Sequence, residues 1–172
     1  MMAPVLLVDG YNIIGAWPKL VKLRDRGDLE GARERLVKDL VDFSHYRAWV
    51  VMLVFDAYGT EGLVSGQVVN GVEIYFTAAM QTADTFIEQR SYALLRAGCE
   101  RLLVATSDRA QRILVEAQGA HVLSAERLGQ EVQRARRERE EHQTSHTSRK
   151  GRTLGDRLDP QTRAKLLNFP KQ

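Results

Sequence analysis

Three short apolar runs in this chain each lead to an acidic residue, and this pattern constrains the fold more than any other feature. The runs cover residues 5–8, 49–55 and 102–105, and the acids that follow them are Asp9, Asp56 and Asp108. Short runs of Val, Leu and Ile without polar alternation are typical of strands buried on both faces of a parallel sheet. Ligands of such sheets bind beyond the carboxyl ends of the strands. We therefore expect the three carboxylates to gather at one edge of the sheet.

Helical patterns alternate with these strands. Apolar residues recur at three- and four-residue spacing between Leu29 and Phe43, and Asp28 is a suitable N-cap for this helix, which we expect to run to about Tyr46. Further strands are expected at about 72–76 and 121–123, and further helices at about 82–97, 109–118 and 125–141. We expect a loop around Trp17-Pro18 and mostly loop over residues 57–71, with room for a short piece of structure. The alternation predicts an α/β three-layer sandwich with a mostly parallel central sheet, whose first strand lies between the strands that precede Asp56 and Asp108.

The charge of the chain is divided unevenly along its length. Residues 1–133 carry 14 Lys+Arg and 17 Asp+Glu, whereas residues 134–172 carry 11 Lys+Arg and 5 Asp+Glu. We expect one folded domain over residues 1–141, followed by a flexible basic linker and a C-terminal helix over residues 142–172. The extension suits contact with a phosphate backbone, and Arg149, Lys150 and Arg152 are the strongest candidates because acids are absent around them. A solvated tail is the plainer alternative.

Several protein classes are excluded by composition. No apolar run approaches the roughly 20 residues of a membrane helix, so we expect no membrane association. The first residues lack the basic start and apolar core of a secretory signal. Cys99 is the only cysteine, so no internal disulfide can form, and a reducing compartment is favoured. We expect a cytoplasmic protein.

Carboxylates that share one edge of a sheet repel one another, so a cation or a shared proton must compensate. A fourth acid, Asp84, is expected in the first turn of the helix over 82–97, and Glu88 lies one turn later on the same face. Asn12 follows Asp9 in a segment that must cross the same edge, and its amide can donate to a phosphate oxygen or to a water. Oxygen-rich sites of this kind suit Mg²⁺ or Mn²⁺. Each acid also has a plainer role, because Asp is common in turns, in helix N-caps and in the first turn of helices.

Other kinds of site are poorly supported. The chain has neither the G-x-x-x-x-G-K-[ST] nor the G-x-G-x-x-G signature, so we expect no nucleotide cofactor. It also lacks the G-x-S-x-G nucleophile elbow of serine hydrolases. His142 and His146 have chelating spacing but lie in the polar stretch expected to be a linker, and the remaining histidines and Cys99 have no familiar zinc-site spacing.

Four ordered motifs resemble those of the YacP-like NYN domain family, a branch of the PIN-like nucleases. They are Val8-Asp9-Gly10-Tyr11-Asn12-Ile13-Ile14, Val54-Phe55-Asp56-Ala57, Gln81-Thr82-Ala83-Asp84 and Ala105-Thr106-Ser107-Asp108. The segments Leu123-Ser124-Ala125-Glu126 and Arg157-Leu158-Asp159-Pro160 extend the likeness, which spans about residues 4 to 167.

The resemblance implies a divalent-metal-dependent endoribonuclease that acts on single-stranded RNA, in some members on mRNA at the ribosome. It places the catalytic residues at Asp9, Asn12, Asp84 and Asp108, with metal held by Asp9, Asp84 and Asp108 and with Asp56 as a further candidate ligand. Thr85 departs from the pattern, because many members have a second acid there. The alternative function is a non-catalytic RNA- or ribosome-binding adaptor on the same fold. The enzyme is favoured because a pure binder has no need of clustered carboxylates that repel phosphate. A small-molecule phosphohydrolase would use the same metal chemistry but leaves the basic extension unexplained.

Overall fold

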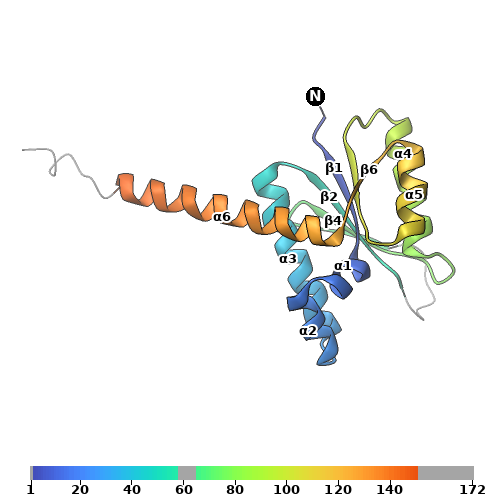
Figure 1. Ribbon diagram of the computed structural model, residues 1–172, viewed down its shortest axis with the longest axis horizontal. Coiled ribbons are helices and arrows are strands. Elements are labelled where there is room, and N and C mark those ends of the chain that lie inside the picture. Colours follow the sequence, from blue (N-terminus) through green and yellow to red (C-terminus); the bar gives the residue numbers. More distant parts are fainter. Residues whose placement is uncertain (1, 58–64, 151–172) are drawn as a thin grey trace, which may run out of the picture. The chain divides into compact units, whose positions relative to one another are not determined.

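The computed structural model describes residues 2–57 and 65–150 (Figure 1). Its elements in chain order are β1 (Val5–Asp9), α1 (Gly10–Ala16), α2 (Pro18–Asp25), α3 (Leu29–Arg47), β2 (Val50–Phe55), β3 (Ser65–Val69), β4 (Val72–Phe76), α4 (Ala83–Arg96), β5 (Leu102–Ala105), α5 (Arg109–Gln118), β6 (His121–Leu123) and α6 (Ala125–Lys150).

Within the described residues, six strands form one sheet in the order β3-β4-β2-β1-β5-β6. All neighbouring pairs are parallel except β3 and β4, so the prediction of a mostly parallel sheet is confirmed. The predicted neighbours of the first strand are also confirmed, since β1 pairs with β2 on one side and with β5 on the other. The carboxyl ends of these three strands therefore meet at one edge of the sheet.

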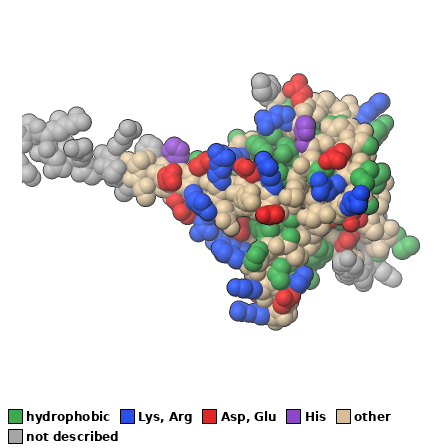
Figure 2. All heavy atoms as spheres, in the orientation of Figure 1, with side chains coloured by type: hydrophobic (Ala, Val, Ile, Leu, Met, Phe, Trp, Pro, Cys, Tyr) green, Lys and Arg blue, Asp and Glu red, His purple; other side chains and the backbone are tan. Residues whose placement is uncertain are grey.

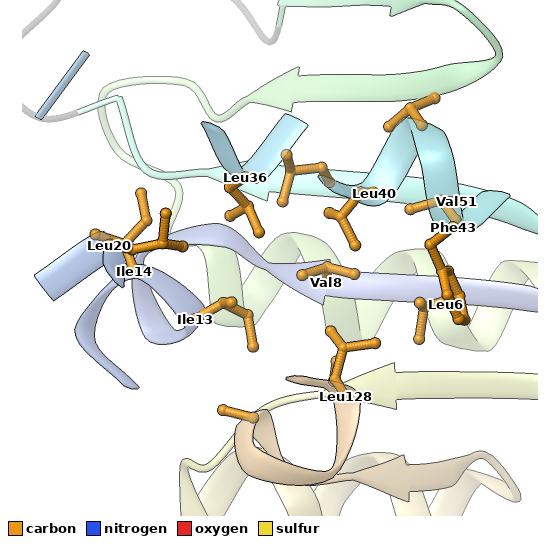
Figure 3. Close-up of a cluster of buried hydrophobic side chains, with 14 of the residues drawn as sticks. Leu6, Val8, Ile13, Ile14, Leu20, Leu36, Leu40, Phe43, Val51 and Leu128 are labelled. Atoms are coloured by element: carbon orange, nitrogen blue, oxygen red, sulfur yellow. The ribbon is translucent and has the colours of Figure 1, made fainter. Parts of the chain in front are cut away.

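Both faces of the sheet are covered by helices, as the two-faced apolar strands predict. Leu6 and Val8 of β1 pack in a cluster with residues of α1, α2, α3 and α6, and Figure 3 shows them beside Leu36, Leu40 and Leu128. Val5 and Leu7 point to the other face, where α4 and α5 supply Ile87 and Val115. Three layers result, which confirms the predicted sandwich. None of the helices that the structure describes is both long enough and apolar enough to cross a bilayer.

Local signals set the ends of several helices. Asp28, Thr82 and Asp108 accept hydrogen bonds from backbone N–H groups of the first turns of α3, α4 and α5, as N-caps do. Gly119 ends α5 in the left-handed conformation, with φ of 103°. The predicted positions of these three helices are confirmed within one or two residues at each end.

The short piece of structure allowed for between residues 57 and 71 is the strand β3. β3 pairs antiparallel with β4, and Val69 opposite Val72 leaves Asn70 and Gly71 as a two-residue turn. Both turn residues have positive φ, 47° and 90°, which is the geometry that an Asn-Gly hairpin favours. β3 was not identified as a strand from the sequence because Ser65-Gly66-Gln67 carries little apolar signal, although the Asn-Gly pair does indicate a hairpin.

The expected loop around Trp17-Pro18 is instead a junction between two short helices. Asp9 caps α1, and Pro18 occupies the first turn of α2, where a missing N–H costs nothing. The indole Nε1 of Trp17 donates to the carbonyl oxygen of Ala125, 2.8 Å away, at the start of α6. Tertiary contacts thus stabilise helices that are too short to be stable alone.

The flexible linker expected from residue 142 onward was also wrong as far as residue 150, because α6 continues to Lys150. No Gly or Pro interrupts residues 130–150, and a helix once begun gains one hydrogen bond for each residue added. The hydroxyls of Thr144 and Ser145 donate to carbonyls three residues earlier, so these polar residues fit inside the helix. Contacts divide the chain into two compact units, Met1–Arg136 and Arg137–Gln172. The predicted boundary at residue 141 stays a prediction, as does the C-terminal helix, which lies outside the described residues.

Candidate active site

Four carboxylates lie where the central strands end. Asp9 is the last residue of β1, Asp56 directly follows β2, Asp84 lies in the first turn of α4, and Asp108 precedes α5. The charges of the other three acids raise the pKa of Asp9, and those of Asp56 and Asp108 raise the pKa of Asp84, so the four lie near one another. We call this set the acidic edge. The structure thus brings together the four acids that the sequence singled out.

Asp9 is the most perturbed member of the acidic edge. Burial, helped by the charges of the neighbouring acids and opposed by a hydrogen bond from the Asn12 N–H, raises the pKa of its carboxyl from the usual 3.8 to about 6. That N–H lies 3.4 Å from Oδ1 of Asp9 and belongs to the first turn of α1. Asp9 is therefore both the N-cap of α1 and a carboxylate whose charge is poorly compensated.

Asp56 and Asp84 are each held by a neighbouring element. Oδ1 of Asp56 accepts from the Ala83 N–H at 2.5 Å, at the start of α4, and from the hydroxyl of buried Thr77 at 3.5 Å. Oδ1 of Asp84 accepts from Nε2 of Gln111 at 2.9 Å. Partial burial and the charges of Asp108 and Asp56 raise the pKa of Asp84. Hydrogen bonds to two different helices thus fix the positions of these carboxylates.

Asn12 connects two parts of the site. Its Oδ1 accepts from the Ser107 N–H at 2.9 Å, in the segment between β5 and α5. Ser107 in turn accepts from the Ala125 N–H through its hydroxyl, and buried Thr106 accepts from the Asp108 N–H. Because the oxygen of the Asn12 amide is occupied, its Nδ2 is the group left to donate. An N–H donor of this kind can bond to the oxygen of a phosphate group or of a water.

The acidic edge has a common hydrogen-bond pattern. In all four acids the bonds formed go to Oδ1, and no donor among the described residues reaches Oδ2. Among the side chains that the structure describes, those of residues 2–57 and 66–145, no three of His, Cys, Asp or Glu lie close enough to hold an ion by themselves. An all-oxygen set with free Oδ2 atoms fits Mg²⁺ or Mn²⁺ bound by one or two carboxylates, with water completing the shell, because Mg²⁺ keeps several waters. It does not fit a closed structural site with four protein ligands.

Sequence reasoning missed Thr77 and Gln111, which orient Asp56 and Asp84. No spacing rule links them to the acids, since Thr77 follows β4 and Gln111 lies in α5. Gln111 carried one signal, because it occupies an inward position of an amphipathic helix beside Val115.

Two further positions of α4 were singled out by the sequence. Thr85 occupies a position at which many members of the family that the sequence resembles have an acid. Its backbone N–H donates to the hydroxyl oxygen of Thr82, so Thr85 takes part in the N-cap of α4. Glu88 lies half-buried in the second turn of α4, and its part in the site stays a prediction.

The structure describes little of the predicted RNA-binding residues. Arg149 and Lys150 are the last residues of α6, while their side chains and the whole of Arg152 lie outside the described part of the chain. Over the face drawn in Figure 2, Lys and Arg side chains are interspersed with Asp and Glu. Arg134, Arg136 and Arg137 of α6 are each followed four residues later by a glutamate, a spacing that favours ion pairs, so the end of the helix is its more basic part.

A cavity of about 700 Å³ lies between α3 and the β3–β4 hairpin. Its apolar lining includes Val37, Val41, Val69 and Phe76, and none of the four acids lines it. The acidic edge is therefore separate from this cavity.

Comparisons with known proteins agree with this architecture. The family described as the YacP-like NYN domain matches residues 6–171. The uncharacterized protein YacP of Bacillus subtilis is 38% identical over 146 residues, which cover 85% of this chain and 85% of that protein. A crystal structure of a mutant of Rae1 (YacP) from Bacillus subtilis matches with a TM-score of 0.74 at 33% identity, covering 95% of this chain and 97% of the other. A second crystal structure of Rae1 (YacP) matches with a TM-score of 0.72 at 38% identity, covering 86% of this chain and 83% of that one. The chain belongs to the YacP-like NYN domain family, and its fold is the PIN-like nuclease fold.

Proposed function

We propose that this protein is a divalent-metal-dependent endoribonuclease that cleaves single-stranded RNA, with mRNA as the substrate and the ribosome as the place of encounter in the cytoplasm. The observation that carries the proposal is the acidic edge, in which four carboxylates are each anchored through Oδ1, while no donor from the described part of the chain reaches Oδ2. A protein that only bound RNA would gain nothing from these acids, because they repel phosphate. Membership of a family with a nuclease-type fold points the same way.

The charged form of Asp9 is disfavoured in the folded protein, which supports a role for a cation. Its pKa of about 6 reflects burial and three neighbouring acids, and a cation would favour its charged form. A bound Mg²⁺ or Mn²⁺ would lower the pKa of a coordinated water and offset charge on the phosphoryl oxygens. We assign the holding of this ion, directly or through bound waters, to Asp9, Asp84 and Asp108, with Asp56 as a further candidate.

The remaining roles fall to groups around the acids. Nδ2 of Asn12 is free to donate to a phosphate oxygen or to the attacking water, since Ser107 occupies its oxygen. Thr77 holds Asp56 in place through its hydroxyl. By resemblance to PIN-like nucleases, the products should carry 5′-phosphate and 3′-hydroxyl ends. The basic end of the chain, with Arg149, Lys150 and Arg152, would contact the RNA or the ribosome without a catalytic part.

Incubation of the purified protein with end-labelled single-stranded RNA and with translating ribosomes tests the proposal. Cleavage is expected with Mg²⁺ or Mn²⁺ and should stop in excess chelator. Asp84→Asn removes a charge at nearly constant size and should lower cleavage on the order of 100-fold or more. The matched control is Asp25→Asn, because Asp25 is an exposed acid of α2 that pairs with Arg24 away from the acidic edge.

The competing function is the non-catalytic adaptor. It is favoured by one observation, that no three potential ligands among the described residues lie close together. RNA or ribosome binding by the parent protein, without cleavage under any divalent ion, would support the adaptor and reject the nuclease. Full cleavage by Asp84→Asn would reject the assignment of the site.

A further inference from the structure

Gln111 is a polar side chain in an unusual position. Only 3% of its surface is exposed, and it lies in the first turn of α5, just beyond Asp108. Glutamine is mostly found at protein surfaces, so a buried one calls for hydrogen-bond partners. Packing explains the position of Gln111 only in part, because Val115, one turn later in α5, already makes the apolar contact with the sheet.

Two acids of the acidic edge contact Gln111 through different atoms. Its backbone N–H donates to Oδ1 of Asp108 at 2.9 Å. Its side-chain Nε2 donates to Oδ1 of Asp84, also at 2.9 Å. Gln111 therefore links the carboxylate that caps α5 to the carboxylate in the first turn of α4, and it sets the position of one relative to the other.

One atom of Gln111 remains unsatisfied. Its Oε1 is buried and accepts no hydrogen bond from any described residue. Because Oε1 and Nε2 belong to one planar amide, the free acceptor lies beside the atom that contacts Asp84. A buried acceptor without a donor lowers folding stability, whereas an apolar side chain of similar size would avoid this cost.

We propose that Gln111 is a positioning residue of the metal site: its Nε2 orients Asp84, and its Oε1 accepts a hydrogen bond from a water in the hydration shell of the cation. This inference rests on the proposed metal-dependent function. Groups that hold metal ligands in place and bond to the surrounding water commonly change metal affinity 10–100-fold when they are replaced. On this proposal, the buried Oε1 of Gln111 has a hydrogen-bond donor only when the site holds its hydrated cation.

Gln111→Met tests the proposal, because methionine keeps the length and burial but removes both the donor and the acceptor. The matched control is Gln118→Met. Gln118 lies at the other end of α5, and its Oε1 is likewise buried without a partner in the described structure. Binding of Mn²⁺ alone is measured by electron paramagnetic resonance, and thermal unfolding is measured in chelator.

Opposite effects on stability and on metal binding are expected. In chelator, Gln111→Met should unfold at the same temperature as the parent protein or higher, since it removes a buried unpaired acceptor. Its affinity for Mn²⁺ should be about 10–100-fold weaker. Gln118→Met should bind Mn²⁺ like the parent. A lower unfolding temperature with unchanged Mn²⁺ affinity would show that Gln111 only ties α5 to α4, and equal loss of affinity in both variants would also overturn the proposal.

A second variant keeps the test decisive if Gln111→Met does not fold. Gln111→Glu retains an acceptor but replaces the donor to Asp84 by a negative charge. It should unfold at a lower temperature than the parent in chelator, and Mn²⁺ should raise its unfolding temperature by more than it raises that of the parent. An equal rise in both proteins would overturn the proposal. If the parent itself binds no Mn²⁺, the proposed metal-dependent function fails as well, and this outcome is distinct from failure of the role of Gln111 alone.

Discussion

Asp9→Asn should stabilise the folded protein at neutral pH even though it removes an acid from the candidate site. Burial, with the three neighbouring acids, raises the pKa of Asp9 from 3.8 to about 6, so the charged form is disfavoured in the folded state. Asparagine has nearly the same shape and no charge. It is also as good an N-cap as aspartate, so the hydrogen bond from the Asn12 N–H should survive.

The size of the effect follows from the pKa. Below about pH 4, the carboxyl holds its proton in both the folded and the unfolded state, so the raised pKa costs nothing. Between about pH 4 and pH 6 the folded state binds more protons than the unfolded state, and stability falls as the pH rises. At about 1.4 kcal/mol for each pH unit, the full penalty above pH 6 is about 3 kcal/mol. Asp9→Asn avoids this penalty, so above pH 6 its Tm should be higher than that of the parent by about 6–12 °C for a protein of this size.

Urea or thermal unfolding in chelator, at about pH 4 and about pH 7.5, measures this difference. The variant should be more stable than the parent by about 3 kcal/mol at the higher pH, and the gap should nearly close at the lower pH. Asp25→Asn serves as the control, since Asp25 is exposed and outside the acidic edge. Adding Mg²⁺ should stabilise the parent more than the variant. A variant that is less stable than the parent at about pH 7.5, or a gap that does not depend on pH, would refute the reasoning.

Two further predictions concern packing and RNA contact. Gly10→Ala should lower the free energy of unfolding by about 1–3 kcal/mol in denaturant titrations, because a Cβ at Gly10 would lie 2.3 Å from the ring of Phe55; unchanged stability would show that the ring can move aside. Simultaneous Ala substitution of Arg149, Lys150 and Arg152 should weaken RNA or ribosome binding and make its salt dependence shallower, by somewhat under one unit of slope for each phosphate that is no longer bound. Mn²⁺ affinity should not change in that variant, and if its RNA affinity and salt dependence match those of the parent, the extension only solubilises the chain.

The buried strands were predictable because their signal is local. The run Val5 to Val8 is apolar on both faces, and a strand with this pattern needs helices on both sides of its sheet. The position of the acids followed from the same pattern, since parallel strands place their carboxyl ends at one edge. Asp9, Asp84 and Asp108 were thus identified from their place in the chain. Asp108 also has the capping role that its sequence context suggested, whereas Asp9, for which a turn was suggested, caps α1.

The errors arose where local signals were weak or were overridden. β3 has few apolar residues and exists because β4 offers it a partner across the Asn70-Gly71 turn. α1 and α2 are short and depend on the burial of Ile13, Ile14 and Leu20 against the sheet. The polar end of α6 was taken for a linker from its composition, although it contains no residue that breaks a helix.

The sequence by itself therefore determined the parallel sheet, its order around β1 and the edge at which the acids gather, because burial on two faces leaves few other arrangements. Tertiary structure alone decided which groups hold those acids. Thr77 reaches Asp56 from the end of β4, Gln111 reaches Asp84 from α5, and Ser107 reaches Asn12 across 95 residues of chain. Hydrogen bonds between residues so distant in sequence leave no periodic pattern, since they depend on the packing of whole elements and not on the conformation of any one segment.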